Sequence, residues 1–192
     1  MKPIARKQEN QQRNAEAKAE AAQDVRNLFE NGLNDIYSAE KTLAQKLPKM
    51  VENASSPELV NTLKNSIATT AQHINRLENI FKTTGLKANA KKSENMEGLL
   101  KETDNVLNQT QKGQALDAGI IAAGQKLKQY EITSLGNLHT YAKNLGENNV
   151  ADLLATTLNE AQQTHAALNG IATSATNNQN LNSNPTANLK KK

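Results

Sequence analysis

Four long stretches of this chain repeat apolar residues at alternating steps of three and four, the spacing of a helix that buries one face. In the first stretch, Phe29, Leu33 and Ile36 begin a stripe that continues to residue 47. No stretch has the alternating β-branched and aromatic residues that are typical of a strand. The pattern therefore predicts an all-α protein, with four helices at 24–52, 57–84, 115–145 and 148–172.

The connections between these stretches predict how the helices are joined. Ser56 and Pro57 suit a helix N-cap and a first helical position, and Gly146 suits a tight helix end. We therefore expect two antiparallel hairpins. About 30 residues join them, enough to run back along a helix of about 40 Å, and they include a short helix from Ser93. Two hairpins joined by one long crossover form a ferritin-like four-helix bundle.

The two ends of the chain differ from the bundle in composition. Residues 1–23 are polar and rich in alanine without an apolar stripe, so we expect an arm that is helical or disordered. Residues 173–192 are rich in asparagine and end in three lysines, which predicts a disordered basic tail. The bundle itself is then residues 24–172. The lysines of the tail are either solvated or make weak contact with nucleic acid or anionic lipid.

The composition excludes several classes of protein. The chain has no cysteine, which rules out disulfides and cysteine-ligated zinc or iron–sulfur clusters. No apolar run approaches the roughly 20 residues that span a bilayer, and the N-terminus lacks the apolar core of a signal peptide. No phosphate-binding loop, Ser/His/Asp constellation or DNA-reading motif is present. We expect a cytoplasmic protein without a membrane span.

Each predicted helix carries polar residues within its apolar stripe, near the middle of its length. Glu40 precedes the first turn by nearly as many residues as His73 follows it. Glu131 and Glu160 are placed in the same way before and after the second turn. These side chains are therefore expected at one depth of the bundle, because the rise per residue is the same in every helix. A buried carboxylate is costly unless it is paired, hydrogen-bonded or bound to a metal.

Carboxylate-bridged di-iron and di-manganese bundles offer one explanation for buried glutamates. They use one Glu from each of two helices and Glu-x-x-His from each of the other two. Here the second helix has Thr70-x-x-His73 and the fourth has Glu160-x-x-Gln163, so one Glu and one His are missing. The alternative is a set of hydrogen-bonded buried acids with a structural histidine. If a metal binds, we expect at most one weakly held iron or manganese ion, on Glu40, His73, Glu131 and Glu160.

Several segments resemble the YciE/YciF-type stress proteins of the ferritin-like superfamily. They are "LNDIYSAEKTLAQKLPKM", "HINRLENIF", "MEGLLKET", "IIAAGQKLKQYEI" and "LLATTLNEA", and the resemblance covers roughly residues 25–172. It implies a bacterial, stress-linked four-helix bundle that is commonly dimeric, so we expect a homodimer that pairs through bundle faces. The family's biochemical activity is poorly defined, so the resemblance implies no particular reaction.

Relative to that family, this chain lacks several possible ligands. Where family members usually read Glu-His-Tyr-Glu, this chain reads Lys-Gln-Tyr-Glu at 128–131. A typical Glu-Glu-Thr is Ala-Thr-Thr at 68–70, and a run of three glutamates is Asn-Glu-Ala at 159–161. Lys128 lies one turn from Glu131, so its ammonium could reach the interior and neutralise the carboxylates in place of a metal cation.

The sequence leaves two classes of function open. The first is a non-catalytic stress-response bundle with a degenerate metal site that acts through assembly or partner binding, and the incomplete ligand set favours it. The second is a metal-dependent oxidoreductase or iron-handling protein that holds iron or manganese and reacts with oxygen or peroxide. Convergence of the four candidate ligands would support a metal, whereas insertion of Lys128 among the acids would support loss of the metal.

Overall fold

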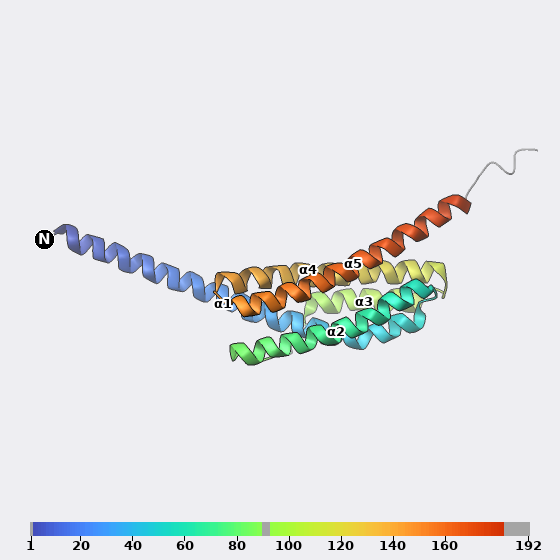
Figure 1. Cartoon of the computed structure of the whole chain (residues 1–192), viewed down its shortest axis with the longest axis horizontal. Coiled ribbons are helices and arrows are strands. Elements are labelled where there is room, and N and C mark those ends of the chain that lie inside the picture. The colour runs from blue at the N-terminus through green and yellow to red at the C-terminus, as the bar shows by residue number, and fades with distance from the viewer. Residues whose placement is uncertain (1, 90–92, 183–192) are drawn as a thin grey trace, which may run out of the picture.

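A computed structural model of the chain describes residues 2–89 and 93–182, with side chains described for 12–89 and 93–174. It contains five helices and, within those ranges, no strand (Figure 1). The prediction of an all-α protein is confirmed. The helices are α1 (Lys2–Asn53), α2 (Pro57–Thr84), α3 (Glu94–Gln109), α4 (Gln114–Asn144) and α5 (Asn148–Asn182).

The five helices form the predicted bundle with a long crossover. The α1–α2 and α4–α5 hairpins pack against each other through contacts of α1 with α4 and of α2 with α5. The crossover carries α3, which lies along α4 and also touches α1 (Figure 1). The inner stripes supply the core, where Phe29, Leu33 and Ile36 of α1 are fully buried with Ile120 and Leu127 of α4.

Two sets of hydrogen bonds stabilise the α1–α2 turn, one within the turn and one from α4. The Ser56 hydroxyl accepts a hydrogen bond from the Leu59 N–H at 3.4 Å, so Ser56 is the N-cap of α2, and Pro57 takes the first helical position. From α4, the buried carboxylate of Asp117 accepts the N–H groups of Ser55 at 2.7 Å and Ser56 at 2.8 Å. Because helix N-termini and turns leave N–H groups without partners, this carboxylate fastens the first hairpin to the second.

The α4–α5 turn is a tight helix stop built on Gly146. Gly146 has a φ of 75°, its N–H donates to the Lys143 carbonyl at 3.1 Å, and the Glu147 N–H donates to the Ala142 carbonyl at 2.9 Å. This pair of bonds is the Schellman motif, which favours glycine at the left-handed position. It lets α5 begin at Asn148, so α4 and α5 lie side by side as the short turn predicted.

Both terminal helices extend beyond the bundle (Figure 1). The N-terminal segment expected to be helical or disordered is part of α1 from Lys2 onward. At the other end, α5 continues to Asn182, so residues 173–182 are helical where a disordered tail was expected. The helix can extend into this polar segment because lengthening an existing helix does not require the costly nucleation of a new one. The rest of the expected tail, 183–192, lies outside the described residues, and the division into arm, bundle and tail stays a prediction.

Within the described ranges, none of the five helices combines the length and the apolar character needed to cross a membrane.

Candidate metal centre

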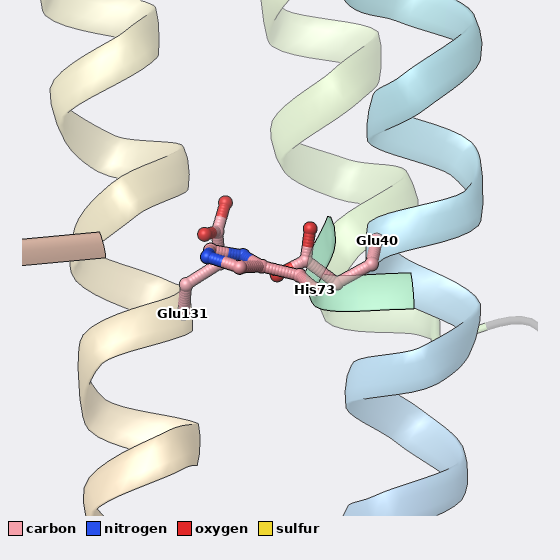
Figure 2. A group of neighbouring side chains, drawn as sticks. All are labelled: Glu40, His73 and Glu131. Atoms are coloured by element: carbon pink, nitrogen blue, oxygen red, sulfur yellow. The ribbon is translucent and has the colours of Figure 1, made fainter. Parts of the chain in front are cut away.

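Glu40, His73 and Glu131 meet at mid-height in the bundle, as their distances from the turns predicted. They come from α1, α2 and α4, and each is 0% exposed. Each residue offers one ligand-type atom, and these atoms all lie within 4.8 Å of one another (Figure 2). The four-residue set predicted from the sequence therefore converges in three of its members.

Glu160, the fourth member, lies on the other side of the His73 ring. The His73 Nδ1 is 2.9 Å from Glu40 Oε1, and its Nε2 is 3.1 Å from Glu160 Oε2. Ionised carboxylates only accept hydrogen bonds, so both contacts are hydrogen bonds only when both ring nitrogens carry protons. Both ring nitrogens thus face a carboxyl group, and a metal ion could bind either nitrogen only by displacing one of these contacts.

Lys128 reaches the bundle interior, as proposed from its position one turn before Glu131. Its side chain is buried, with 3% of the residue exposed. The Nζ donates to both carboxylate oxygens of Glu131, at 2.9 Å and 2.8 Å. Both oxygens that could bind a metal are therefore engaged by an ammonium that belongs to the same helix.

Arg76 completes the set of charges and was not singled out from the sequence. Its guanidinium binds Glu160 with two parallel hydrogen bonds of 3.0 Å and 3.1 Å, and Nη1 also donates to the Thr157 hydroxyl at 2.8 Å. The spacing of three between His73 and Arg76 places both on one face of α2, and this spacing was the available signal. An arginine at the edge of a buried stripe usually reaches outward to water, which is why the signal is weak.

The centre holds equal numbers of acidic and basic side chains. With His73 protonated, three carboxylates face three cations, so the group is neutral without any added ion. Burying charges costs several kcal/mol for each ion unless they are paired and hydrogen-bonded, and most of these oxygens and nitrogens are. The group consists of Glu40, His73, Arg76, Lys128, Glu131 and Glu160.

Burial and neighbouring charge perturb the protonation of the Lys128–Glu131 pair. Burial, followed by the negative charge of Glu40, raises the pKa of Glu131 to about 7, although Lys128 and His73 act in the opposite direction. Burial alone would lower the pKa of Lys128, but the charges of Glu131 and Glu40 outweigh it and raise that pKa above its usual value. Lys128 is therefore a permanent cation at neutral pH, whereas Glu131 can take up a proton.

Two buried oxygens at this level have no hydrogen-bond partner within the protein. They are Oε2 of Glu40 and Oγ1 of Thr70. An unpaired buried polar group costs about 1–3 kcal/mol, so each of these two oxygens favours a small polar partner such as a water molecule. Glu40 Oε2 is also the one carboxylate oxygen of the converging three residues that neither Lys128 nor His73 engages.

The side chains as arranged do not fit a dinuclear metal centre. Such a centre needs about six protein ligands with carboxylates that bridge the metals. Here Lys128 holds both oxygens of Glu131, and His73 lies between two carboxylates. Glu40, His73 and Glu131 could hold one ion only if Lys128 and Glu160 gave up these contacts.

The family model described as a domain of unknown function, DUF892, matches residues 24–181. The chain belongs to this family. Among its relatives is Protein YciF from Escherichia coli strain K12, which is 36% identical over 149 residues that cover 77% of this chain and 90% of that protein.

Two solved structures match the fold closely. The crystal structure of the E. coli stress protein YciF matches with a TM-score of 0.77 at 35% identity, covering 80% of this chain and 97% of that one. YcfI from Rhodopseudomonas palustris matches with a TM-score of 0.73 at 34% identity, covering 76% and 92%. The resemblance to YciF-type stress proteins and the ferritin-like bundle are thereby confirmed. The DUF892 match begins at residue 24, so the first part of α1 precedes it.

Proposed function

We propose that this chain is a bacterial stress-response protein whose ferritin-like bundle is non-catalytic, with protein side chains in place of a resident metal. The stress role rests on kinship with the E. coli stress protein YciF. The loss of the metal rests on one observation, the Lys128 ammonium bound to both oxygens of buried Glu131. The bundle then acts as a helical scaffold through assembly or partner binding.

Electrostatics explains why Lys128 opposes a metal. At about 4 Å and an effective dielectric constant near 20, two unit charges of the same sign repel by about 4 kcal/mol, and a divalent cation doubles that value. A metal beside Glu131 would have to overcome this repulsion and also displace the ammonium from its two oxygens. Lys128 thus acts as a built-in counterion.

The same contacts tie the helices together at mid-height. His73 of α2 contacts Glu40 of α1 and Glu160 of α5, while Arg76 of α2 strengthens the contact with α5. The charge set therefore supports a structural role for this centre. No substrate or redox step is required of it.

The second candidate is an iron- or manganese-binding protein that handles iron or reacts with oxygen or peroxide. It is favoured by the closeness of the ligand-type atoms of Glu40, His73 and Glu131 and by the unpaired Oε2 of Glu40. This candidate requires Lys128 to leave Glu131 when the metal binds.

Metal stoichiometry separates the two candidates. The protein is purified without chelator and its iron and manganese are measured, then measured again after anaerobic loading with ferrous iron. We expect less than one ion per chain, weakly held. Two tightly held ions per chain would overturn the proposal and support the oxidoreductase.

The variant Lys128→Glu tests the cause. It removes the repulsion and adds a carboxylate, so it should bind more iron than the parent protein. Lys126→Glu is the matched control, because Lys126 lies on the same helix but is exposed and pairs with Glu102. Equal iron binding by Lys128→Glu and Lys126→Glu would show that Lys128 does not control the site.

A further inference from the structure

A small cavity lies between α1 and the start of α3, away from the charged centre. Its volume is about 190 Å³, and it is partly open to solvent. From α1 it is lined by Ser38, Ala39 and Thr42, and from the start of α3 by Ser93 and Met96. An apolar cavity of about 150 Å³ is large enough to admit benzene, so small polar solutes such as water and hydrogen peroxide fit into this one.

Met96 is a buried methionine that small solutes in the cavity can reach. Only 2% of the residue is exposed, yet its side chain lines the cavity. Met50, the other methionine with a described side chain, is 0% exposed and does not line this cavity. The two buried methionines therefore differ in their access to a small oxidant. A thioether is oxidised to a polar sulfoxide, which disrupts apolar packing.

The wall of the cavity offers a hydroxyl group to a solute beside Met96. Ser38 is 5% exposed, and the Thr42 hydroxyl donates to its backbone carbonyl at 2.8 Å. Within the described residues no partner takes the Ser38 hydroxyl itself, whereas the Ser93 hydroxyl is 3.0 Å from that of Tyr130. The Ser38 hydroxyl is thus free to donate a hydrogen bond to an oxygen atom in the cavity.

The helix α3 is packed tightly near its end and less firmly at its start. Near the end, a Cβ atom added to Gly119 of α4 would lie 2.6 Å from Cγ1 of Val106, so the two helices are in close contact there. At the start, Ser93 makes no side-chain capping bond to α3. Met96 is the first buried residue of α3, so the anchoring of its first turns depends on this side chain.

We propose that Met96 is an oxidation site for hydrogen peroxide, which reaches the thioether through the cavity with the Ser38 hydroxyl as hydrogen-bond donor. The Met96 sulfur attacks one peroxide oxygen, so that the O–O bond breaks and an S–O bond forms. The sulfur loses two electrons, the transferred oxygen gives its proton to the departing hydroxide, and water leaves. The polar sulfoxide then fits the apolar anchor poorly, and the first turns of α3 loosen.

This reaction consumes one peroxide for each Met96 and needs no metal. It is therefore independent of the charged centre and of the proposed loss of the metal. All tests use the full-length chain with chelator present, so that bound iron does not generate other oxidants.

The first test compares the rates at which individual methionines are oxidised. The protein is treated with hydrogen peroxide, and mass spectrometry of its peptides follows the gain of one oxygen at each methionine. Met96 should react about tenfold faster than Met50 or more, because Met50 reacts only when the core opens. Lys126→Met supplies a methionine at an exposed position as a reference, and it should react at least as fast as Met96. Equal rates at Met96 and Met50 would overturn the proposal, because both would then react only in the unfolded protein.

The second test removes the hydroxyl group. Ser38→Ala should slow the oxidation of Met96 by about two- to tenfold, the usual contribution of one neutral hydrogen bond. Ser66→Ala is the matched control, because Ser66 is also buried but donates to the Thr62 carbonyl on α2 and does not line the cavity. Its Met96 should react as in the parent. A Met96 in Ser38→Ala that reacts as fast as in Ser66→Ala, or faster, would contradict the role of Ser38.

The third test measures the effect of the sulfoxide on α3. After oxidation, amide hydrogen exchange should become faster in residues 94–99, while residues 103–109 should exchange as before because they are packed closely against α4. Met96→Leu keeps an apolar side chain of similar volume without the sulfur, so peroxide should not change its exchange. Unchanged exchange at 94–99 in the oxidised parent would show that the sulfoxide does not loosen α3. The same acceleration in Met96→Leu would place the responsible oxidation elsewhere.

Discussion

Replacing Lys128 with methionine should destabilise the bundle in a way that depends on pH. Methionine keeps the length of the side chain but removes the ammonium that binds both oxygens of Glu131. The buried carboxylate then faces Glu40 without a counterion. Removing one partner of a buried pair typically costs about 3–5 kcal/mol, and we expect a loss of this size in the free energy of unfolding above pH 8.

Protonation of Glu131 should relieve this cost at lower pH. The pKa of Glu131 is raised to about 7 even with Lys128 present, so the carboxyl binds a proton more readily in the folded state than in the unfolded state. Stability then falls as pH rises from the unfolded pKa, near 4.3, through the folded pKa. The variant should therefore lie closest to the parent near pH 5 and diverge from it as pH rises.

The free energies of unfolding of the variant and the parent are measured by urea unfolding at several pH values, with chelator present. Far-ultraviolet circular dichroism follows the loss of helix. Lys128→Met/Glu131→Gln removes both charges and should recover most of the lost stability at pH 8. Lys126→Met, an exposed change on the same helix, should stay within about 0.5 kcal/mol of the parent. If Lys128→Met matched Lys126→Met at pH 8, the ammonium would not be the counterion of Glu131.

Two further changes test the contacts that surround the centre. Asp117→Asn removes the negative charge that accepts the Ser55 and Ser56 N–H groups. It should lower the free energy of unfolding by about 1–3 kcal/mol in the same urea assay. An unchanged unfolding midpoint would show that Asp117 does not stabilise the contact between the two hairpins. Arg76→Met breaks the paired hydrogen bonds to Glu160. Because the Glu160 side chain is partly exposed, the free energy of unfolding should fall by only about 1 kcal/mol. A fall larger than that caused by Lys128→Met would show that the main counterion of the centre is on α2.

The fold and the depth of the centre could be predicted because both follow from local rules. Helical spacing fixes which residues face inward, and turn positions fix how far along the bundle they lie. Counting from the two turns was therefore enough to bring Glu40, His73 and Glu131 together. The placement of Lys128 followed from a spacing of three on one helix, which needs no knowledge of the other helices.

The contacts that the sequence did not predict depend on how separate helices dock. Asp117 reaches the N–H groups of a turn that is far from it in the sequence, and nothing in its own neighbourhood marks that contact. Arg76 meets Glu160 only because α2 lies beside α5. The packing of α2 against α5 also decides on which side of the His73 ring Glu160 lies. The sequence therefore could not predict that Glu160 would contact the opposite ring nitrogen from Glu40.

Lys128 is proposed to balance the charge of Glu131 in place of a metal. The most direct test is a crystal of the parent protein soaked in ferrous iron without oxygen, with anomalous diffraction measured at the iron absorption edge. We expect no fully occupied iron peak between Glu40 and Glu131, with the Lys128 ammonium within hydrogen-bond distance of both Glu131 oxygens. A fully occupied iron peak bound by Glu40, His73 and Glu131, with Lys128 turned away, would contradict the replacement of the metal by Lys128.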